Sequence, residues 1–242
     1  MDLRRQMAYY GFFLRPTSRR NMNSQRKYDL ICFDVDGTLI RHPSDKVIWE
    51  ILNIRFTGDD RVNRERYRMY LTGEISYADW VRLDVEGWIE ADATRDQVVE
   101  AVREFQVYPG ALETVHALKD RGVHLAVISG TIDVVIDTLF PDHPFDDVFT
   151  NKILFNGDGH VAGGEATPYD LHGKPVALRD LAQRHGVPLE RTAFVGDGEN
   201  DVPIIGVAGY VVAFNPRCEE LEQGADRVMK DRNMLELLDV LA

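Results

Sequence analysis

Two carboxylates stand two residues apart in the segment Asp34-Val-Asp36-Gly-Thr38. An ionised Asp can attack phosphorus and form an aspartyl-phosphate, which divides a difficult hydrolysis into two easier transfers. A second carboxylate beside it can protonate the leaving alkoxide and then deprotonate the attacking water. Because Asp-Gly-Thr is also common turn chemistry, this segment alone is equally compatible with a simple surface turn.

Two other segments could hold an anion. Ser129-Gly130-Thr131 follows an apolar run, and its hydroxyls and backbone N–H groups can bind an anion, although Ser and Thr are also common helix caps. Lys174 stands at the start of a predicted helix, where a cation opposes the helix dipole. A solvated surface Lys is the more common case, but its position favours the neutralisation of a phosphate.

The segment Gly196-Asp-Gly-Glu-Asn-Asp201 places Asp197 and Asp201 directly after another apolar run. The glycines allow the backbone to turn sharply, and oxygen-rich side chains suit a hard cation such as Mg²⁺. Three acids beside a buried strand are costly unless a cation compensates them. The segment therefore indicates a metal site more strongly than a surface turn.

Short β-prone runs precede three of these segments, so the sequence predicts a doubly wound α/β fold with one parallel sheet covered on both faces. Parallel strands end at one edge of a sheet, where ligands bind, so the segments should meet there. The predicted strands are 29–33, 124–128, 192–195 and 210–214, with a hairpin joining 153–155 to 160–161. The predicted helices of this part are 111–121, 174–185 and 234–241, and the Ser129-Gly-Thr131 segment is expected to open another helix.

Residues 44–105 interrupt this alternation with helices alone, which predicts a small helical cap inserted after the first strand. The expected helices are 45–56, capped by Ser44, then 60–71, 76–89, and one from a Thr94 capping box to about Phe105. Residues 28–43 and 106–242 then form the α/β core. Residues 1–27 are predicted to be a basic, disordered leader; a transit peptide, a membrane-surface anchor and a translation start misassigned upstream of Met22 are the alternatives.

Composition limits the partners. The net charge is −12, and residues 1–27 hold seven basic residues and one acid. The remainder therefore holds 21 basic and 39 acidic residues. Such an excess of negative charge argues against binding nucleic acid. No apolar stretch approaches the roughly 20 residues of a membrane span, so integral membrane association is not expected. Cys32 and Cys218 form no disulfide framework, which favours the reducing cytoplasm. We expect a monomer or homodimer.

The ordered set of DVDGT, a Ser after the second core strand, a Lys and GDGEND resembles the haloacid dehalogenase (HAD) superfamily. The resemblance runs from about Tyr28 to the C-terminus and is strongest to the phosphoserine phosphatase-like branch. It implies Mg²⁺ as cofactor and a role for each matching residue. These roles are Asp34 as nucleophile, Asp36 as acid/base, Asp34, Asp197 and the main chain of Asp36 as metal ligands, Ser129, Gly130 and Lys174 as phosphate holders, Asp201 as support for the metal or Lys174, and Asn200 facing the substrate.

The predicted function is a Mg²⁺-dependent phosphomonoesterase acting on a small phosphorylated metabolite through an aspartyl-phosphate. Asp36 favours phosphate chemistry, because the family's dehalogenases lack an Asp at that place. A phosphotransferase or mutase that passes the phosphoryl group to a sugar is an alternative. A non-catalytic binding module is a second alternative, disfavoured because every charged motif position is present.

The substrate is not predicted. The family's phosphoserine phosphatases carry a Glu after the first motif and an Arg in the cap, whereas residues 41–45 contain no Glu and Asp84 falls where the Arg would be. Both differences argue against phosphoserine. Tyr77, Asp84 and Trp88 share one helix face, which would either receive a cationic or amino substrate or pack as an ordinary hydrophobic face with Asp84 on its rim. The second interpretation is favoured.

Overall fold

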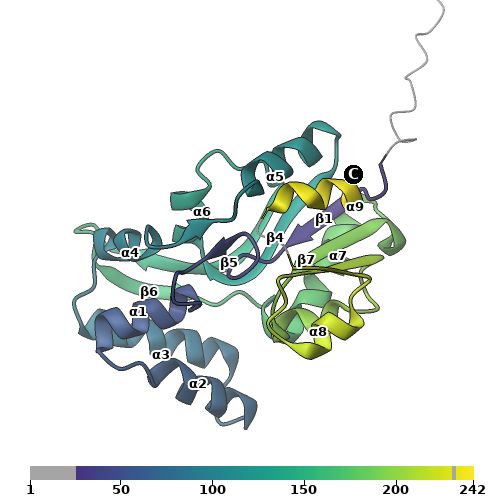
Figure 1. Cartoon of the computed structure of the whole chain (residues 1–242). Helices are drawn as coiled ribbons and strands as arrows, with labels where there is room; N and C mark the ends of the chain where they lie inside the picture. The colour runs from purple at the N-terminus through teal and green to yellow at the C-terminus, as the bar shows by residue number, and fades with distance from the viewer. Residues whose placement is uncertain (1–25, 231–232) are drawn as a thin grey trace, which may run out of the picture.

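The computed structural model of the protein describes residues 26–230 and 233–242, so all but the last two residues of the predicted leader lie outside it. Its centre is a seven-stranded sheet with the strand order β6-β5-β4-β1-β7-β8-β9 (Figure 1). Neighbouring strands run parallel except for the antiparallel pair β5–β6. The strands are β1 (Leu30–Phe33), β4 (His124–Ile132), β5 (Asp147–Phe155), β6 (Val161–Glu165), β7 (Thr192–Gly196), β8 (Tyr210–Phe214) and β9 (Arg227–Met229).

Both faces of the sheet are buried, as the continuous apolar run of β1 requires. Ile31 and Phe33 point into one core, while Leu30 and Cys32 point into the other, because successive side chains of a strand alternate between faces. The first core is closed by helices α5 (Ala111–Asp120), α6 (Asp133–Leu139) and α9 (Leu237–Leu241), and the second by α7 (Lys174–His185) and α8 (Glu219–Gly224). The predicted doubly wound α/β fold is confirmed.

Four helices lie between the short strands β2 (Ile40–Arg41) and β3 (Gln106–Val107), which pair with each other antiparallel. We call residues 48–102 the insertion. Figure 1 shows α1, α2 and α3 grouped beside the sheet, where α3 packs on β6, while α4 lies next to α6. The four helices are α1 (Ile48–Thr57), α2 (Val62–Leu71), α3 (Tyr77–Glu90) and α4 (Arg95–Val102).

The helix starts of the insertion follow local capping chemistry. Ser76 caps α3 and Thr94 caps α4, each in a capping box with the residue three positions later. The predicted cap at Ser44 is wrong, because its hydroxyl lies 2.7 Å from His42 Nδ1 and Asp45 is left-handed with φ of 58°. Helix α1 therefore begins at Ile48, three residues later than expected.

Two sequence predictions near β4 need correction. Ser129, Gly130 and Thr131 lie inside β4 and do not open a helix; α6 begins at Asp133. Strand β5 begins at Asp147, six residues before the predicted range, because its first half pairs with β4 although its composition is mixed. No helix among the described residues is long and apolar enough to cross a bilayer.

Candidate active site

Three neighbouring strands at the centre of the sheet, β4, β1 and β7, bring the predicted residues to one edge. Asp34 follows β1, Ser129 lies in the second half of β4, and Asp197 follows β7. Two more predicted residues join them from the helical side, Lys174 at the start of α7 and Asp201 in the 3₁₀ segment Glu199–Ile204. All of these side chains are buried.

Lys174 is the electrostatic centre of the site. Its side chain is wholly buried, and its ammonium nitrogen lies 3.0 Å from Asp34 Oδ1 and 2.6 Å from Asp201 Oδ1. Burial disfavours the charged ammonium, but the two carboxylates outweigh it, so the pKa of Lys174 lies above its ordinary value. Lys174 is therefore a fixed cation beside Asp34.

Asp201 holds this arrangement in place. Its second oxygen accepts the backbone N–H groups of Asp197 and Gly198 at 2.8 and 3.0 Å. One oxygen thus fixes Lys174 and the other fixes the turn that carries Asp197. The sequence resemblance implied that Asp201 supports either the metal or Lys174. These contacts favour the support of Lys174.

Asp36 differs from Asp34 in its environment. Its Oδ1 accepts the backbone N–H of Ile48 at 3.2 Å, at the start of α1. Burial raises the pKa of Asp36 to about 6, and the negative charge of Asp34 adds to the rise. A carboxyl group with this pKa can give and take a proton near neutral pH, which suits an acid/base.

The acidic cluster fits a divalent metal ion. Asp34, Asp197 and Asp201 can each bring one carboxylate oxygen within 4.8 Å of the others. With Asp36 they are four acids facing two cations, Lys174 and Arg217, so full ionisation leaves two excess negative charges. Asp34 Oδ1 is ion-paired with Lys174 but receives no hydrogen bond within the described residues, so it keeps acceptor capacity for an ion. Oxygen ligands with this charge excess are the kind of set that Mg²⁺ prefers.

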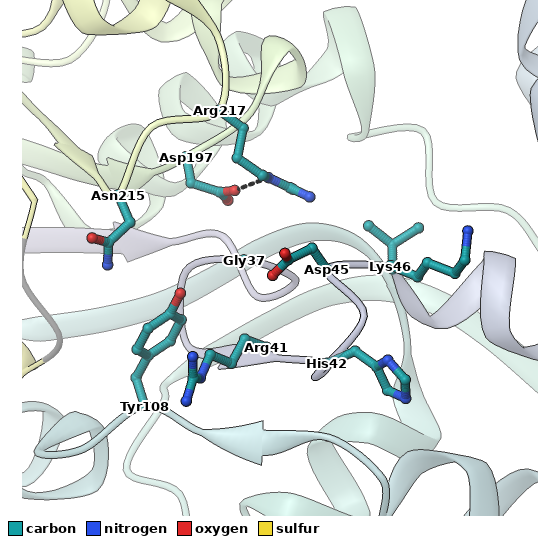
Figure 2. A pocket seen from close by; sticks show the side chains of 10 residues that line it. Gly37, Arg41, His42, Asp45, Lys46, Tyr108, Asp197, Asn215 and Arg217 are labelled. Carbon is teal, nitrogen blue, oxygen red and sulfur yellow. Dashed lines mark hydrogen bonds and ion pairs between the residues drawn. The ribbon is translucent and has the colours of Figure 1, made fainter.

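Two residues that the sequence did not single out complete the surroundings of Asp197. Thr38 donates its hydroxyl to Asp197 Oδ1 at 2.9 Å, and Arg217 Nε contacts Oδ2 (Figure 2). Gly37 has φ of +90°, and a Cβ there would lie 2.2 Å from Asp197 Oδ2, so only glycine fits. Arg217 had one sequence signal, since it closely follows β8 at the same sheet edge.

Aromatic side chains of the insertion make polar contacts with the core at this edge. Trp49 Nε1 donates to the carbonyl oxygen of Gly130 at 2.7 Å, and Asn151 donates to the Tyr77 hydroxyl at 2.8 Å. The Tyr67 hydroxyl donates to Glu199 at 3.1 Å. Aromatic side chains of the insertion thus lie against the segments that carry the predicted phosphate and substrate contacts.

Asn200, predicted to face the substrate, lies at this interface too. Its side-chain amide donates to Asp170 Oδ1 at 3.2 Å, and Asp170 also lies close to the backbone of Gly130. Asp170 was not predicted, because it stands in a loop without a recognisable motif. It connects Asn200 with the Gly130 segment.

Asp84 does not lie on the rim of α3 as predicted. It is buried, pairs with Arg66 of α2 and accepts a hydrogen bond from Asn53 of α1 at 3.0 Å. Trp88 beside it is also buried and donates to Asn53 at 2.8 Å. Asp84 therefore joins three helices of the insertion, and because Arg66 already neutralises it, it gives no support to a cationic substrate.

Burial of the acids predicts how the metal-free protein responds to pH. The pKa values of Asp197 and Asp201 are raised to about 8 and about 6, chiefly by burial. The folded state then holds protons that the unfolded state has released, so stability falls as pH rises through this range. In a chelator, we expect a lower melting temperature at pH 8.5 than at pH 7, and a larger rise on adding Mg²⁺ at pH 8.5. Asp197→Asn is the control. If the melting temperature of the wild type falls with pH no more steeply than that of this variant, the prediction is contradicted.

Together, the fold and the site define an α/β enzyme with a carboxylate beside a buried cation and an acidic metal-type cluster. Residues 31–205 match the family described as haloacid dehalogenase-like hydrolase. The chain belongs to this family, as the sequence resemblance implied.

Its relatives are named phosphatases. A phosphoserine phosphatase of Mycobacterium tuberculosis is 35% identical over 190 residues, which cover 78% of this chain and 44% of that protein, so the chain spans less than half of this relative. The phosphoserine phosphatase of Methanocaldococcus jannaschii is 29% identical over 217 residues, covering 88% of this chain and 98% of that protein. A solved phospho-aspartyl intermediate analogue of phosphoserine phosphatase superposes with a TM-score of 0.71 at 27% identity, covering 90% of this chain and all of that one. The predicted enzyme class, a phosphatase of the HAD family, is confirmed.

Proposed function

We propose that the protein is a Mg²⁺-dependent phosphomonoesterase that releases phosphate from a small metabolite through an aspartyl-phosphate on Asp34. The observation that carries the proposal is the wholly buried Lys174, held between Asp34 and Asp201. Taking charged groups out of water to form a buried ion pair is costly and contributes little net stability, so the place of Lys174 beside the nucleophile favours a role toward an anion that enters the site. A phosphoryl group is the anion that fits an attacking carboxylate.

In the first step, a carboxylate oxygen of Asp34 attacks phosphorus, and the bond from phosphorus to the ester oxygen breaks. Asp36 gives its proton to the departing alkoxide. Lys174 and the backbone N–H of Gly130 hold the phosphoryl oxygens. Ser129 can add its hydroxyl hydrogen, because its oxygen already accepts the N–H of Thr131 at 3.1 Å.

In the second step, Asp36 takes a proton from water, and the resulting hydroxide attacks phosphorus. The bond to Asp34 breaks, phosphate leaves, and both carboxyl groups return to their starting states. Mg²⁺, held by Asp34, Asp197 and the main-chain oxygen of Asp36, would withdraw negative charge from the transferring group when bound.

The four helices of the insertion serve, in this proposal, as a cap that covers the substrate. The names of the relatives make phosphoserine the first compound to test. The position where the family's cap Arg would fall holds Asp84, and it is buried against Arg66. We therefore propose a small phosphorylated metabolite as the substrate class, without the two clamps of the family's phosphoserine enzymes.

The test is a panel of serine, ethanolamine and choline phosphates, sugar phosphates and nucleotides, with phosphate release measured in Mg²⁺ and in chelator. We expect release from one chemical class in Mg²⁺, none in chelator, and recovery when Mg²⁺ is restored. No turnover on any compound would reject the proposal. Added sugar acceptors test the phosphotransferase alternative, which predicts a phosphorylated acceptor in place of free phosphate.

We further propose a cytoplasmic enzyme that acts as a monomer or homodimer and binds no nucleic acid. Both cysteines are free, and Cys32 is buried in the sheet, where burial raises the pKa of its thiol above the ordinary value. A buried thiol with a raised pKa is unreactive, which agrees with a structural role in a reducing compartment.

A further inference from the structure

Arg217 contacts the same groups that the metal ion is proposed to use. Its Nε forms an ion pair with Asp197 Oδ2, drawn as a dashed line in Figure 2. Its Nη2 lies 3.4 Å from the main-chain oxygen of Asp36 and donates a hydrogen bond to it. Two of the three proposed ligands of Mg²⁺ are therefore contacted by one guanidinium group.

These contacts occupy one acceptor position on each carboxylate oxygen of Asp197. Thr38 donates to Oδ1 at 2.9 Å, and Arg217 contacts Oδ2. Mg²⁺ binds carboxylate oxygens at about 2.1 Å and prefers strict octahedral geometry. A guanidinium group at Oδ2 takes an acceptor position that such an ion could use, and a second positive charge at the same carboxylate would be repelled. The two cations therefore compete for Asp197 and for the main-chain oxygen of Asp36.

Arg217 has room to withdraw. Its side chain is 44% exposed, although the Asp197 carboxylate beneath it is fully buried. It lines a pocket of about 370 Å³ together with Asp45 and Tyr108 and with the basic residues Arg41, His42 and Lys46 (Figure 2). The backbone N–H of Arg217 donates to the main-chain oxygen of Asp197 at 2.7 Å, so the loop is anchored while the side chain can turn into the pocket.

We propose that Arg217 is a built-in competitor of the metal: its guanidinium occupies the cation position in the metal-free protein and moves into the adjoining pocket when Mg²⁺ binds. The inference rests on the proposed Mg²⁺-dependent function. Arg217 stabilises the metal-free fold by compensating Asp197, and for the same reason it weakens Mg²⁺ binding. A contact made in only one of two states shifts their equilibrium by its own free energy.

The test is calorimetric titration of MgCl₂ into the chelator-treated full-length chain, without substrate. Arg217→Gln is expected to bind Mg²⁺ roughly two- to fivefold more tightly than wild type, the factor expected for a half-exposed ion pair. In chelator the variant should melt at a lower temperature than wild type, and Mg²⁺ should raise its melting temperature by more. Unchanged or weaker binding by Arg217→Gln overturns the proposal.

Arg41→Gln is the matched control. Arg41 lines the same pocket, but its side chain contacts Gln106 and the ring of Tyr108, and within the described part of the chain it forms no hydrogen bond or ion pair with Asp197. The Arg41→Gln substitution thus removes one positive charge, as Arg217→Gln does, without freeing a proposed ligand of Mg²⁺. If Arg41→Gln tightens Mg²⁺ binding as much as Arg217→Gln does, long-range charge explains the effect and the proposal is overturned.

A second variant keeps the test decisive if Arg217→Gln does not fold without metal. Arg217→Lys keeps a cation but loses the contact with Asp36, so it should bind Mg²⁺ more tightly than wild type by a smaller factor; equal or weaker binding counts against the proposal. The proposed function fails separately. If the wild type binds Mg²⁺ and releases phosphate but the Arg217 variants bind Mg²⁺ no more tightly, only the proposed competition is overturned. If the wild type binds no Mg²⁺, the proposed function and the proposed competition are both overturned.

Discussion

Asp34→Asn is expected to lower phosphate release by at least roughly a thousandfold, because an amide cannot act as the nucleophile that forms the acyl-phosphate. The loss should not come from unfolding. The substitution removes one negative charge from a cluster with an excess of them, and Lys174 keeps its contact with Asp201. In chelator, the melting temperature should therefore stay the same or rise.

The measurement is steady-state phosphate release with the best substrate of the panel, beside thermal unfolding of the same samples. Asp120→Asn is the matched control, because it makes the same chemical change at an exposed position near the end of α5. The control should behave like wild type. An Asp34→Asn variant that keeps more than about one tenth of the activity would show that another group attacks phosphorus.

Lys174→Met is expected to remove activity and to destabilise the metal-free protein by about 3–5 kcal/mol, the usual cost of breaking a buried ion pair from one side. The methionine chain replaces the buried stem, but it leaves Asp34 and Asp201 without their shared cation. Urea unfolding in chelator measures the change in the free energy of unfolding.

Lys119→Met provides the comparison for this variant. Lys119 pairs with Asp146 at the surface, where the two side chains are 35% and 28% exposed, so its loss should cost about 0–1 kcal/mol. Adding Asp201→Asn to Lys174→Met should recover part of the lost stability, because it removes one of the uncompensated charges. Equal destabilisation by the two lysine variants would contradict the role assigned to Lys174.

The sequence was most informative where local chemistry marks an element. Helix α7 was predicted to the residue, because Pro175 stands in its first turn and Gly186 ends it in the left-handed conformation. The apolar runs of β1 and β7 likewise located Asp34 and Asp197 at one sheet edge. These signals depend on neighbouring residues, which a sequence displays directly.

Other features depend on partners that are distant in the chain. Strand β9 has three residues and exists through its pairing with β8, so no periodicity could reveal it. The neutralisation of Asp84 by Arg66 joins two helices and cannot be inferred from the spacing of either one. Arg217 stands in a loop without a motif, and its contact with Asp197 becomes visible only when β7 and β8 are placed side by side.

The pairing of β2 with β3 has a mechanical consequence for the insertion. The chain passes through Ile40–Arg41 before the insertion and through Gln106–Val107 after it, and these two strands are hydrogen-bonded into one ribbon. The backbone N–H of Tyr108 extends the ribbon by donating to Leu39 at 2.9 Å. A two-stranded ribbon bends across its face more easily than it shears along its length, because shear breaks its hydrogen bonds. A second attachment lies at the turn between β5 and β6, where the backbone N–H of Arg95 donates to Gly159 and that of Val161 donates to Ala93, both at 2.8 Å. Any movement of the four helices away from the sheet would therefore have to bend the ribbon and break this second attachment as well.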